Sequence, residues 1–281
     1  MVSAVIVTAL CAPAVNWGGT FREIPGSRKC CCGPKASSSQ TASLSSTTTD
    51  MTISTVNAHC LRCKPHKNLS LAKRVSLSVV RPRPRIVAGL DVSYASEQFG
   101  AATCTAVDIK TGRLLWSETV TRKIGFPYIS SFLTFRELPI LLDLLDATMT
   151  FEPCPDWFLV DGSGIIHPRG AGVATMLGVV AGVPTIGITK KRLFGRVDTR
   201  GMRPGHVRAV MDRRRKLGVA LRPRTGTHRP LFVSPGHGVS VAAAERVVSR
   251  MLLQRRLPEP IYWADRLSRQ AARTCAADWS P

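Results

Sequence analysis

The ten residues that begin at Asp161 combine side chains that suit metal or phosphate chemistry. Asp161 follows the apolar run 157–160, which is typical of a buried strand, so its carboxylate is expected at the carboxyl end of that strand. Two glycines allow the backbone to turn sharply behind the acid. His167 and Arg169 then bring an imidazole and a guanidinium nearby, and an arginine in such a setting commonly binds phosphate. Taken alone, the segment is equally typical of a turn with a surface salt bridge.

Two further acids lie in or beside expected elements, Asp91 within the apolar strand 86–94 and Glu137 near the start of a helix. Burying an unpaired acid among apolar residues is costly, and coordination of a metal ion is one arrangement that offsets the cost. Oxygen ligands favour Mg²⁺ or Mn²⁺. Such an ion can activate water and stabilise the charge that develops in phosphodiester hydrolysis. His237, at the end of another expected strand, is a candidate general acid, general base or ligand. Scattered salt bridges are the competing interpretation.

The elements that must position these acids predict an α/β fold, a mixed β-sheet flanked by helices. Three strands come first in meander order, and later strands alternate with segments of helical periodicity. The strands are expected at 86–94, 100–108, 113–120, 157–160, 184–189, 217–222 and 230–237, and the helices near 137–145, 172–180, 241–253 and 264–273.

The chain is strongly basic, with a formal net charge of +21 from 39 Lys and Arg against 18 Asp and Glu. The stretch 191–229 alone carries thirteen Lys and Arg against two Asp. This excess would attract a polyanion, either nucleic acid or an anionic membrane surface, while a solvated basic loop is the alternative. No apolar run reaches the roughly 18 residues that a membrane-spanning helix needs, so no membrane partner is expected.

Residues 1–65 differ in composition from the remainder of the chain. They include the Ser- and Thr-rich segment 36–49, which buries too little apolar surface to offset the entropy of ordering. We therefore predict a disordered, low-complexity extension at 1–65 and an ordered domain at 66–281. The apolar first fifteen residues lack the positively charged start of a secretory signal, and the nine cysteines show no regular spacing. A cytoplasmic location is expected.

Five short motifs follow one another along the ordered domain. They are Asp91-Val-Ser-Tyr94, Phe126-Pro-Tyr128 with Phe135-Arg136-Glu137, Asp161-Gly-x-Gly-x-x-His167-Pro-Arg169, Ile186-Gly-x-x-Lys190 and Val233-Ser-Pro-Gly-His237. In this combination the chain closely resembles the endonuclease V family. The resemblance runs from about Leu69 to Arg269 and does not include the extension.

The resemblance implies a ribonuclease-H-like fold and a Mg²⁺-dependent DNA repair endonuclease, with Mn²⁺ as a possible substitute. The implied substrate is damaged DNA that contains deoxyinosine, the product of adenine deamination. Family members hydrolyse the second phosphodiester bond on the 3′ side of the lesion and leave 3′-hydroxyl and 5′-phosphate ends. A monomer is expected.

By matching position, the resemblance also implies roles for single residues. Asp91, Glu137 and Asp161 would form the acidic metal site, with His237 as their catalytic neighbour. Tyr128 would belong to a wedge that separates strands, since a rigid aromatic ring can replace the stacking partner of a base that is turned out. Lys190 would contact the phosphate near the cut. The complete set of expected DNA contacts is Pro127, Tyr128, His167, Arg169 and Lys190.

Four positions depart from the family pattern and leave the range of lesions open. Ser130 and Ser131 stand where Pro-Gly is typical, Met176 stands where His is typical, and Ser163 stands where a bulkier polar residue is common. Two alternative functions also remain. The chain could be a nuclease for inosine in single-stranded RNA, which contacts to the 2′-hydroxyl would decide. It could also be a non-catalytic basic protein that binds nucleic acid.

Overall fold

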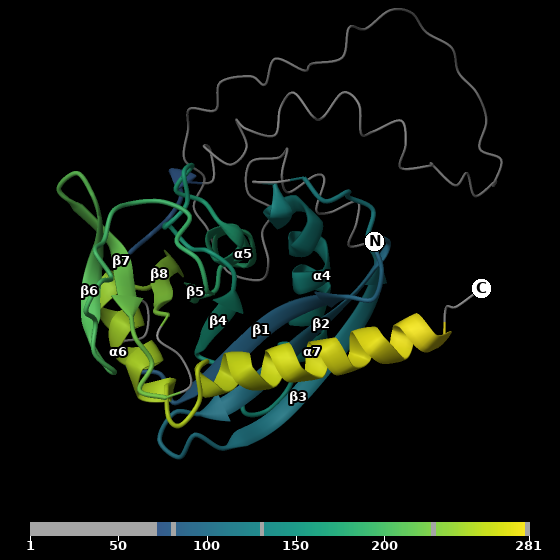
Figure 1. Cartoon of the computed structure of the whole chain (residues 1–281). Coiled ribbons are helices and arrows are strands. Elements are labelled where there is room, and N and C mark those ends of the chain that lie inside the picture. Colours follow the sequence, from purple (N-terminus) through teal and green to yellow (C-terminus); the bar gives the residue numbers. More distant parts are fainter. Residues whose placement is uncertain (1–71, 80–82, 130–131, 226–228, 279–281) are drawn as a thin grey trace, which may run out of the picture. The chain divides into compact units, whose positions relative to one another are not determined.

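The structure is a computed structural model that describes residues 72–79, 83–129, 132–225 and 229–278. These residues belong to the unit Lys64–Pro281, so the predicted extension at 1–65 lies outside the described residues. The unit is built on one eight-stranded mixed sheet with helices packed against it (Figure 1). This confirms the predicted α/β class.

Eight strands and four helices position the side chains discussed below, and the strand order along the sheet is β3-β2-β1-β4-β5-β8-β7-β6. The strands are β1 (Ile86–Tyr94), β2 (Phe99–Asp108), β3 (Leu114–Lys123), β4 (Trp157–Asp161), β5 (Thr185–Thr189), β6 (Val207–Asp212), β7 (Arg215–Leu221) and β8 (Leu231–His237). The helices are α4 (Leu133–Thr148), α5 (Val173–Ala181), α6 (Val241–Met251) and α7 (Glu259–Asp278).

The ends of the strands form two opposite edges of the sheet, and the strand directions decide which residues lie at each edge. β1, β4 and β5 are parallel, so their carboxyl ends meet at one edge, which we call the acidic edge. β8 is antiparallel to β5 and β7 is antiparallel to β8, so β8 begins and β7 ends at the acidic edge. The turn that joins β6 to β7 therefore lies at the opposite edge.

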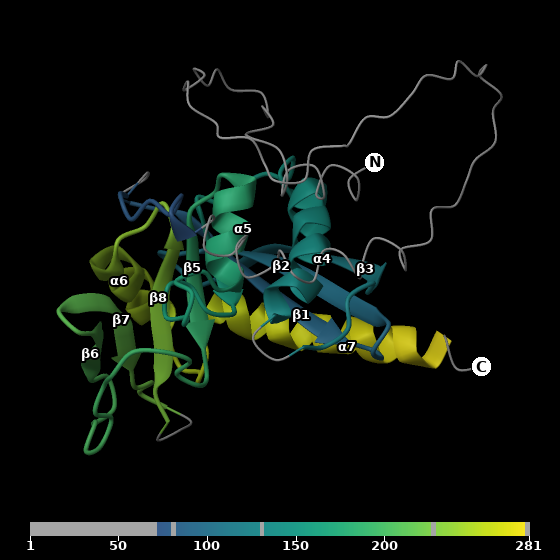
Figure 2. The same cartoon turned by 90° about the horizontal axis from the view of Figure 1, so that it is seen from above.

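The helices cover both faces of the sheet. α4 and α5 pack side by side on one face, while α6 and α7 pack on the other (Figure 2). β4 and β5 are covered on both faces, which explains why their sequences are almost continuously apolar. Among the described residues, no helix is both long enough and apolar enough to cross a membrane.

Three elements differ most from the sequence prediction, among them α7, which spans Glu259–Asp278 and not the predicted 264–273. β6 was not predicted, because its residues are partly exposed at the end of the sheet and do not alternate cleanly. α4 begins at Leu133 and contains Pro139 in its interior, so it starts before the predicted position. Glu137 nevertheless lies near the amino end of α4, as expected.

A close approach of α7 to β1 fixes the position of the last helix. A Cβ atom on Gly89 would lie 2.2 Å from the carbonyl carbon and oxygen of Pro260, so only glycine fits at this point of β1. The Thr105 hydroxyl on β2 donates a hydrogen bond of 2.8 Å to the same Pro260 carbonyl. The first turn of α7 is thereby held against β1 and β2, and the next turns run past the end of β1.

Candidate functional site

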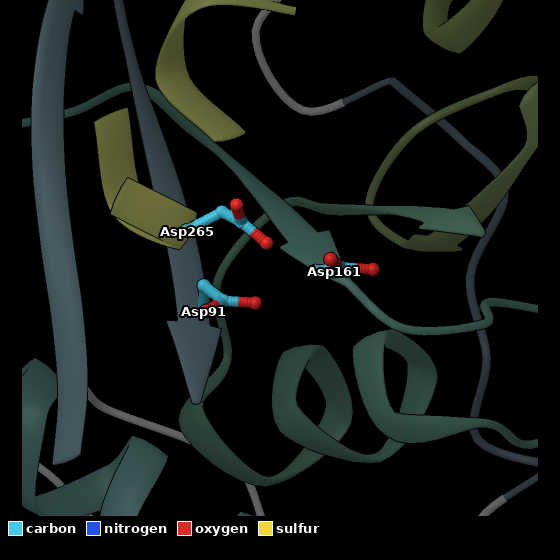
Figure 3. Close-up of side chains that lie close together, drawn as sticks. All are labelled: Asp91, Asp161 and Asp265. Atoms are coloured by element: carbon cyan, nitrogen blue, oxygen red, sulfur yellow. The ribbon is translucent and has the colours of Figure 1, made fainter. Parts of the chain in front are cut away.

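Three aspartates from different elements converge at the acidic edge (Figure 3). Asp91 lies in β1, Asp161 ends β4 and Asp265 lies in α7. One carboxylate oxygen from each lies within 4.8 Å of the others. The parallel pairing of Leu90 with Val160 places Asp91 and Asp161 next to each other, and α7 supplies the third acid.

Burial makes this cluster, which we call the acidic cluster, a costly arrangement of negative charge. Desolvation and, after it, the charge of the neighbouring Asp161 carboxylate raise the pKa of Asp91 to about 6. A group of like-charged carboxylates, one buried and two partly buried, that offers only oxygen atoms fits a hard divalent cation such as Mg²⁺ or Mn²⁺. The acidic cluster could therefore bind a metal ion, and Asp265 was not among the predicted ligands.

Glu137 borders the acidic cluster but is not part of the close set of three. Burial and, after it, the negative charges of Asp91 and Asp161 together raise its pKa to about 8. The Tyr94 hydroxyl donates a hydrogen bond of 3.3 Å to Glu137 Oε1. Glu137 is thus electrostatically coupled to both predicted partners, and its role as a direct ligand stays a prediction.

The Arg269 guanidinium donates to Asp265 Oδ1 at 2.7 Å, and a second positive charge comes from Lys190. Its Nζ atom donates to Asp161 Oδ2 at 2.8 Å and lies 3.6 Å from Asp265 Oδ1. Burial alone would lower the pKa of Lys190, but the Asp161 and Asp265 carboxylates more than compensate and raise it. Lys190 is only partly buried, so its side chain is accessible to solvent as well as to the carboxylates. Its predicted contact with phosphate stays a prediction.

Hydroxyl groups next to the acidic cluster hold Asp91 in place. Ser268, fully buried and one turn beyond Asp265 on α7, donates a hydrogen bond to Asp91 Oδ2. Ser93 lies 2.9 Å from the Ser268 hydroxyl and also donates to Asp91 Oδ2, at 3.4 Å. Sequence reasoning missed both Asp265 and Ser268. The available signal was their i, i+3 spacing, which places them on one face of a helix.

The structure does not bring His237 to the acidic cluster. His237 pairs with Thr185 at the start of β5, whereas Asp161 pairs with Ile188 near its end. Three residues of strand separate these levels by about 10 Å, in addition to the spacing between strands. The predicted position of His237 beside the acids is therefore wrong, because β8 runs antiparallel to β5 and ends at the opposite edge. Instead, His237 Nδ1 accepts a hydrogen bond from the Ser76 backbone N–H.

The segment around Tyr128 is anchored to the acidic edge through one arginine. The Arg136 guanidinium donates to the backbone carbonyls of Phe126 at 2.7 Å and Glu97 at 2.6 Å. It also lies over the Tyr94 ring, 4.4 Å from the ring centroid. Beyond this anchor, Pro127 and Tyr128 are exposed, Tyr128 to 70%. An exposed aromatic on a fixed backbone suits the predicted wedge, and Ser130 and Ser131 lie outside the described residues.

His167 and Arg169 differ in their contacts in the structure. His167 is buried, and burial followed by the charge of Arg169 lowers its pKa to about 4, so the ring is neutral near pH 7. Its Nδ1 atom accepts a hydrogen bond from the Arg169 backbone N–H. The Arg169 guanidinium lies over the Phe132 ring, 4.7 Å from its centroid. The buried ring points to a supporting role for His167, and a DNA contact of either residue stays a prediction.

Comparison with known proteins identifies relatives of this chain. Residues 69–266 match the family model described as endonuclease V. Endonuclease V of Ignicoccus hospitalis is 42% identical over 193 residues, which cover 67% of this chain and 83% of that protein. Endonuclease V of Azotobacter vinelandii is 42% identical over 205 residues, which cover 72% of this chain and 90% of that protein.

Solved structures agree with the sequence comparison. The catalytic domain of human endonuclease V is 30% identical with a TM-score of 0.72, covering 78% of this chain and 98% of that chain. Ciona intestinalis endonuclease V, solved with a 24mer DNA containing an inosine followed by a ribo-adenosine, is 26% identical with a TM-score of 0.68. That match covers 77% of this chain and 99% of the other. The fold is accordingly ribonuclease-H-like, as expected.

Proposed function

Because the chain belongs to the endonuclease V family of nucleases, we propose that it is a metal-dependent DNA repair endonuclease that recognises deoxyinosine. It hydrolyses the second phosphodiester bond 3′ to the lesion and leaves 3′-hydroxyl and 5′-phosphate ends. The observation that carries the proposal is the acidic cluster beside Lys190. Its three carboxylates suit a metal ion, and the lysine ammonium suits a phosphate. The exposed Tyr128 segment supports the recognition of a base turned out of its stack.

The acidic cluster would hold a Mg²⁺ ion, with Mn²⁺ as a substitute, through Asp91, Asp161 and Asp265. When bound, such an ion supplies Lewis acidity and an acidified water. Lys190, which contacts Asp161 and lies near Asp265, would place its ammonium beside the phosphate next to the cut. Glu137 borders the acidic cluster, and its raised pKa makes its carboxylate a stronger base than an ordinary glutamate, so it is our candidate for proton acceptor.

Inosine-containing RNA is the second candidate substrate. The observation that favours it is the ribo-adenosine next to the inosine in the DNA that Ciona intestinalis endonuclease V binds. A ribonucleotide at that position offers a 2′-hydroxyl, which a protein can use to distinguish RNA from DNA. A binding protein without catalysis is disfavoured, because a complete acidic cluster and its lysine are present.

A nicking assay tests the proposed function. End-labelled duplexes that contain inosine, uracil, an abasic site or no lesion are incubated with Mg²⁺, and a single-stranded RNA with inosine is run beside a matched DNA. We expect cleavage of the inosine duplex only, at the second bond 3′ to the lesion and only without chelator. Equal cleavage of all duplexes would contradict lesion recognition, and faster cleavage of the RNA would favour the alternative.

A further inference from the structure

The turn between β6 and β7 presents an unusual set of positive charges at the opposite edge of the sheet. Asp212 pairs with Arg215, so Arg213 and Arg214 form a two-residue turn. Arg213, Arg214, Arg215 and Lys216 are all exposed. Lys216 contacts Glu245 of α6 at 3.5 Å, but among the described residues no carboxylate pairs with Arg213, Arg214 or Arg215. We call these three residues the arginine tip.

Local stability does not explain the residues of the arginine tip. Arg213 has a φ of 51°, in the left-handed region, where short hairpins normally carry Gly, Asn or Asp. A long side chain in this conformation is strained relative to glycine. The adjoining positive charges repel one another as well. Both costs would be offset if the guanidinium groups bound a polyanion.

The arginine tip is too far from the acidic cluster to contact the same phosphates. Ala220 of β7, Phe232 of β8 and Thr189 of β5 pair at one level, next to Lys190. From Ala220 to Arg215 the strand runs about 16 Å towards the opposite edge. A ligand seated on the acidic cluster must therefore continue along the protein to reach the tip.

A basic segment connects the two sites. It begins at Lys190, which contacts Asp161, and continues through the exposed Lys191 and Arg192. Arg196, which is also exposed, then exchanges backbone hydrogen bonds of 2.6 and 2.9 Å with Met211. Met211 lies two residues before the arginine tip. Positive side chains thus recur between the acidic edge and the turn, although residues 193–195 are uncharged and Asp212 precedes Arg213.

We propose that the arginine tip binds the sugar-phosphate backbone of a single-stranded flank of the substrate, which reaches it along residues 190–196. The inference rests on the proposed action on nucleic acid. Arginine suits this ligand because its planar guanidinium binds phosphate oxygens through two parallel hydrogen bonds. A duplex is too stiff to bend over so short a distance, since its persistence length is about 150 base pairs, whereas a single strand follows the surface freely.

Binding measurements with three ligands test the proposal. Each ligand contains one inosine duplex of about 10 base pairs, either unflanked, with a single-stranded flank of about 20 nucleotides, or with that flank made double-stranded. The protein is compared with Arg213→Gly/Arg214→Gln/Arg215→Gln, in which glycine suits the left-handed backbone. Affinity is measured against salt concentration with a chelator present, so that no cleavage occurs.

We expect the variant to lower the slope of log affinity against log salt by about 2 for the single-stranded flank, because each lost phosphate contact removes about 0.7. The other two ligands should bind both proteins equally. The control Lys110→Gln/Arg113→Gln/Arg273→Gln removes the same charge elsewhere and should bind like the parent. Equal slopes for variant and parent, or an equal loss in the control, would overturn the proposal. If the arginine tip bound an acidic protein instead, the slopes of variant and parent would be equal.

The difference in salt slope between parent and variant with the single-stranded flank, which we call the flank effect, can be tested separately from the proposed function. The same three ligands are prepared without inosine, because phosphate contacts carry no base information. If the parent fails to nick inosine but the flank effect persists, the proposed function fails and the arginine tip remains. If the parent nicks inosine and shows no flank effect, only the present proposal fails.

Discussion

The charge of Asp91 depends on side chains from three other elements. The carboxylate of Asp161 opposes its ionisation, whereas the Ser268 hydroxyl and the Lys190 ammonium favour it. Ser268 is the only one of these groups without charge, and its hydrogen bond fixes which Asp91 oxygen remains available to a ligand. It therefore acts as a positioning residue for the acidic cluster.

Replacing Ser268 with alanine should weaken Mg²⁺ binding by about 10- to 100-fold, as expected when a partner that orients a metal ligand is lost. Isothermal titration calorimetry with Mg²⁺ and with Mn²⁺ measures the affinity, and circular dichroism checks that the fold is retained. Ser249→Ala, an exposed serine on α6, is the matched control. An affinity equal to that of the parent would show that Ser268 does not position Asp91.

Glu137 and Asp91 should make the metal-free protein less stable as the pH rises. Their pKa values are raised in the folded state, to about 8 and about 6, so the folded protein retains protons that the unfolded chain releases from about pH 4 upward. The free energy of unfolding should therefore fall between pH 5 and pH 8. Urea denaturation with a chelator measures it.

Glu137→Gln isolates this effect, because it removes the titrating group that has the largest raised pKa. The variant should lose less stability than the parent over the same pH interval. Added Mg²⁺ should reduce the loss in the parent, since it binds the deprotonated carboxylates. An identical pH dependence in parent and variant would contradict the assigned pKa shift.

At the scale of elements, the contact between α7 and β1 decides whether the acidic cluster forms. Gly89→Ala should lower the free energy of unfolding by about 1 to 3 kcal/mol, because its Cβ would collide with the Pro260 backbone rather than with a side chain that can move. Metal affinity should fall as well, since Asp265 moves with α7. Chemical denaturation and calorimetry measure the two effects.

The control for this substitution is Gly100→Ala in the adjacent strand β2. There the nearest atom to a new Cβ, at 3.1 Å, belongs to the flexible side chain of Ile124. The control should cost less stability and leave the metal affinity unchanged. An equal fall in metal affinity for both variants would show that the position of α7 does not determine the acidic cluster.

The elements that sequence reasoning predicted well are those whose burial leaves a pattern. β4 and β5 are buried on both faces, and their apolar runs predicted them. β6 is half exposed at the end of the sheet and was missed. The sequence also did not predict which strands pair with each other. An isolated sequence does not show that β8 runs antiparallel to β5, which is why His237 was placed at the wrong edge.

At the scale of the whole molecule, the acidic cluster depends on strand order. Asp91 and Asp161 were predicted because each is an acid at or near the end of an apolar strand. Asp265 lies in an amphipathic helix among other charged residues, where an acid is ordinary. Only the packing of α7 across β1 reveals it as the third member. The net charge of +21 predicted a polyanionic ligand. It did not predict that Lys190 lies at the acidic edge while the arginine tip lies at the opposite edge.

The domain boundary is a prediction for the whole molecule. A chain that begins at His66 should nick an inosine duplex as fast as the full chain and should unfold at the same temperature, because the family match begins at residue 69. Nicking rates and thermal melting of the two proteins check this. A large loss of either in the shorter chain would show that residues 1–65 contribute to the catalytic unit.

The central claim is that Asp91, Asp161 and Asp265 form the metal centre of an inosine-directed nuclease. Its most direct test is the rate of nicking of an inosine duplex across a Mg²⁺ titration, for the parent, for Asp265→Asn and for the exposed-acid control Asp146→Asn. We predict a loss of at least about 100-fold in Asp265→Asn, Mg²⁺-dependent nicking at the parental rate in Asp146→Asn, and no nicking without metal. Parental nicking by Asp265→Asn, or nicking by the parent with a chelator present, would contradict the claim.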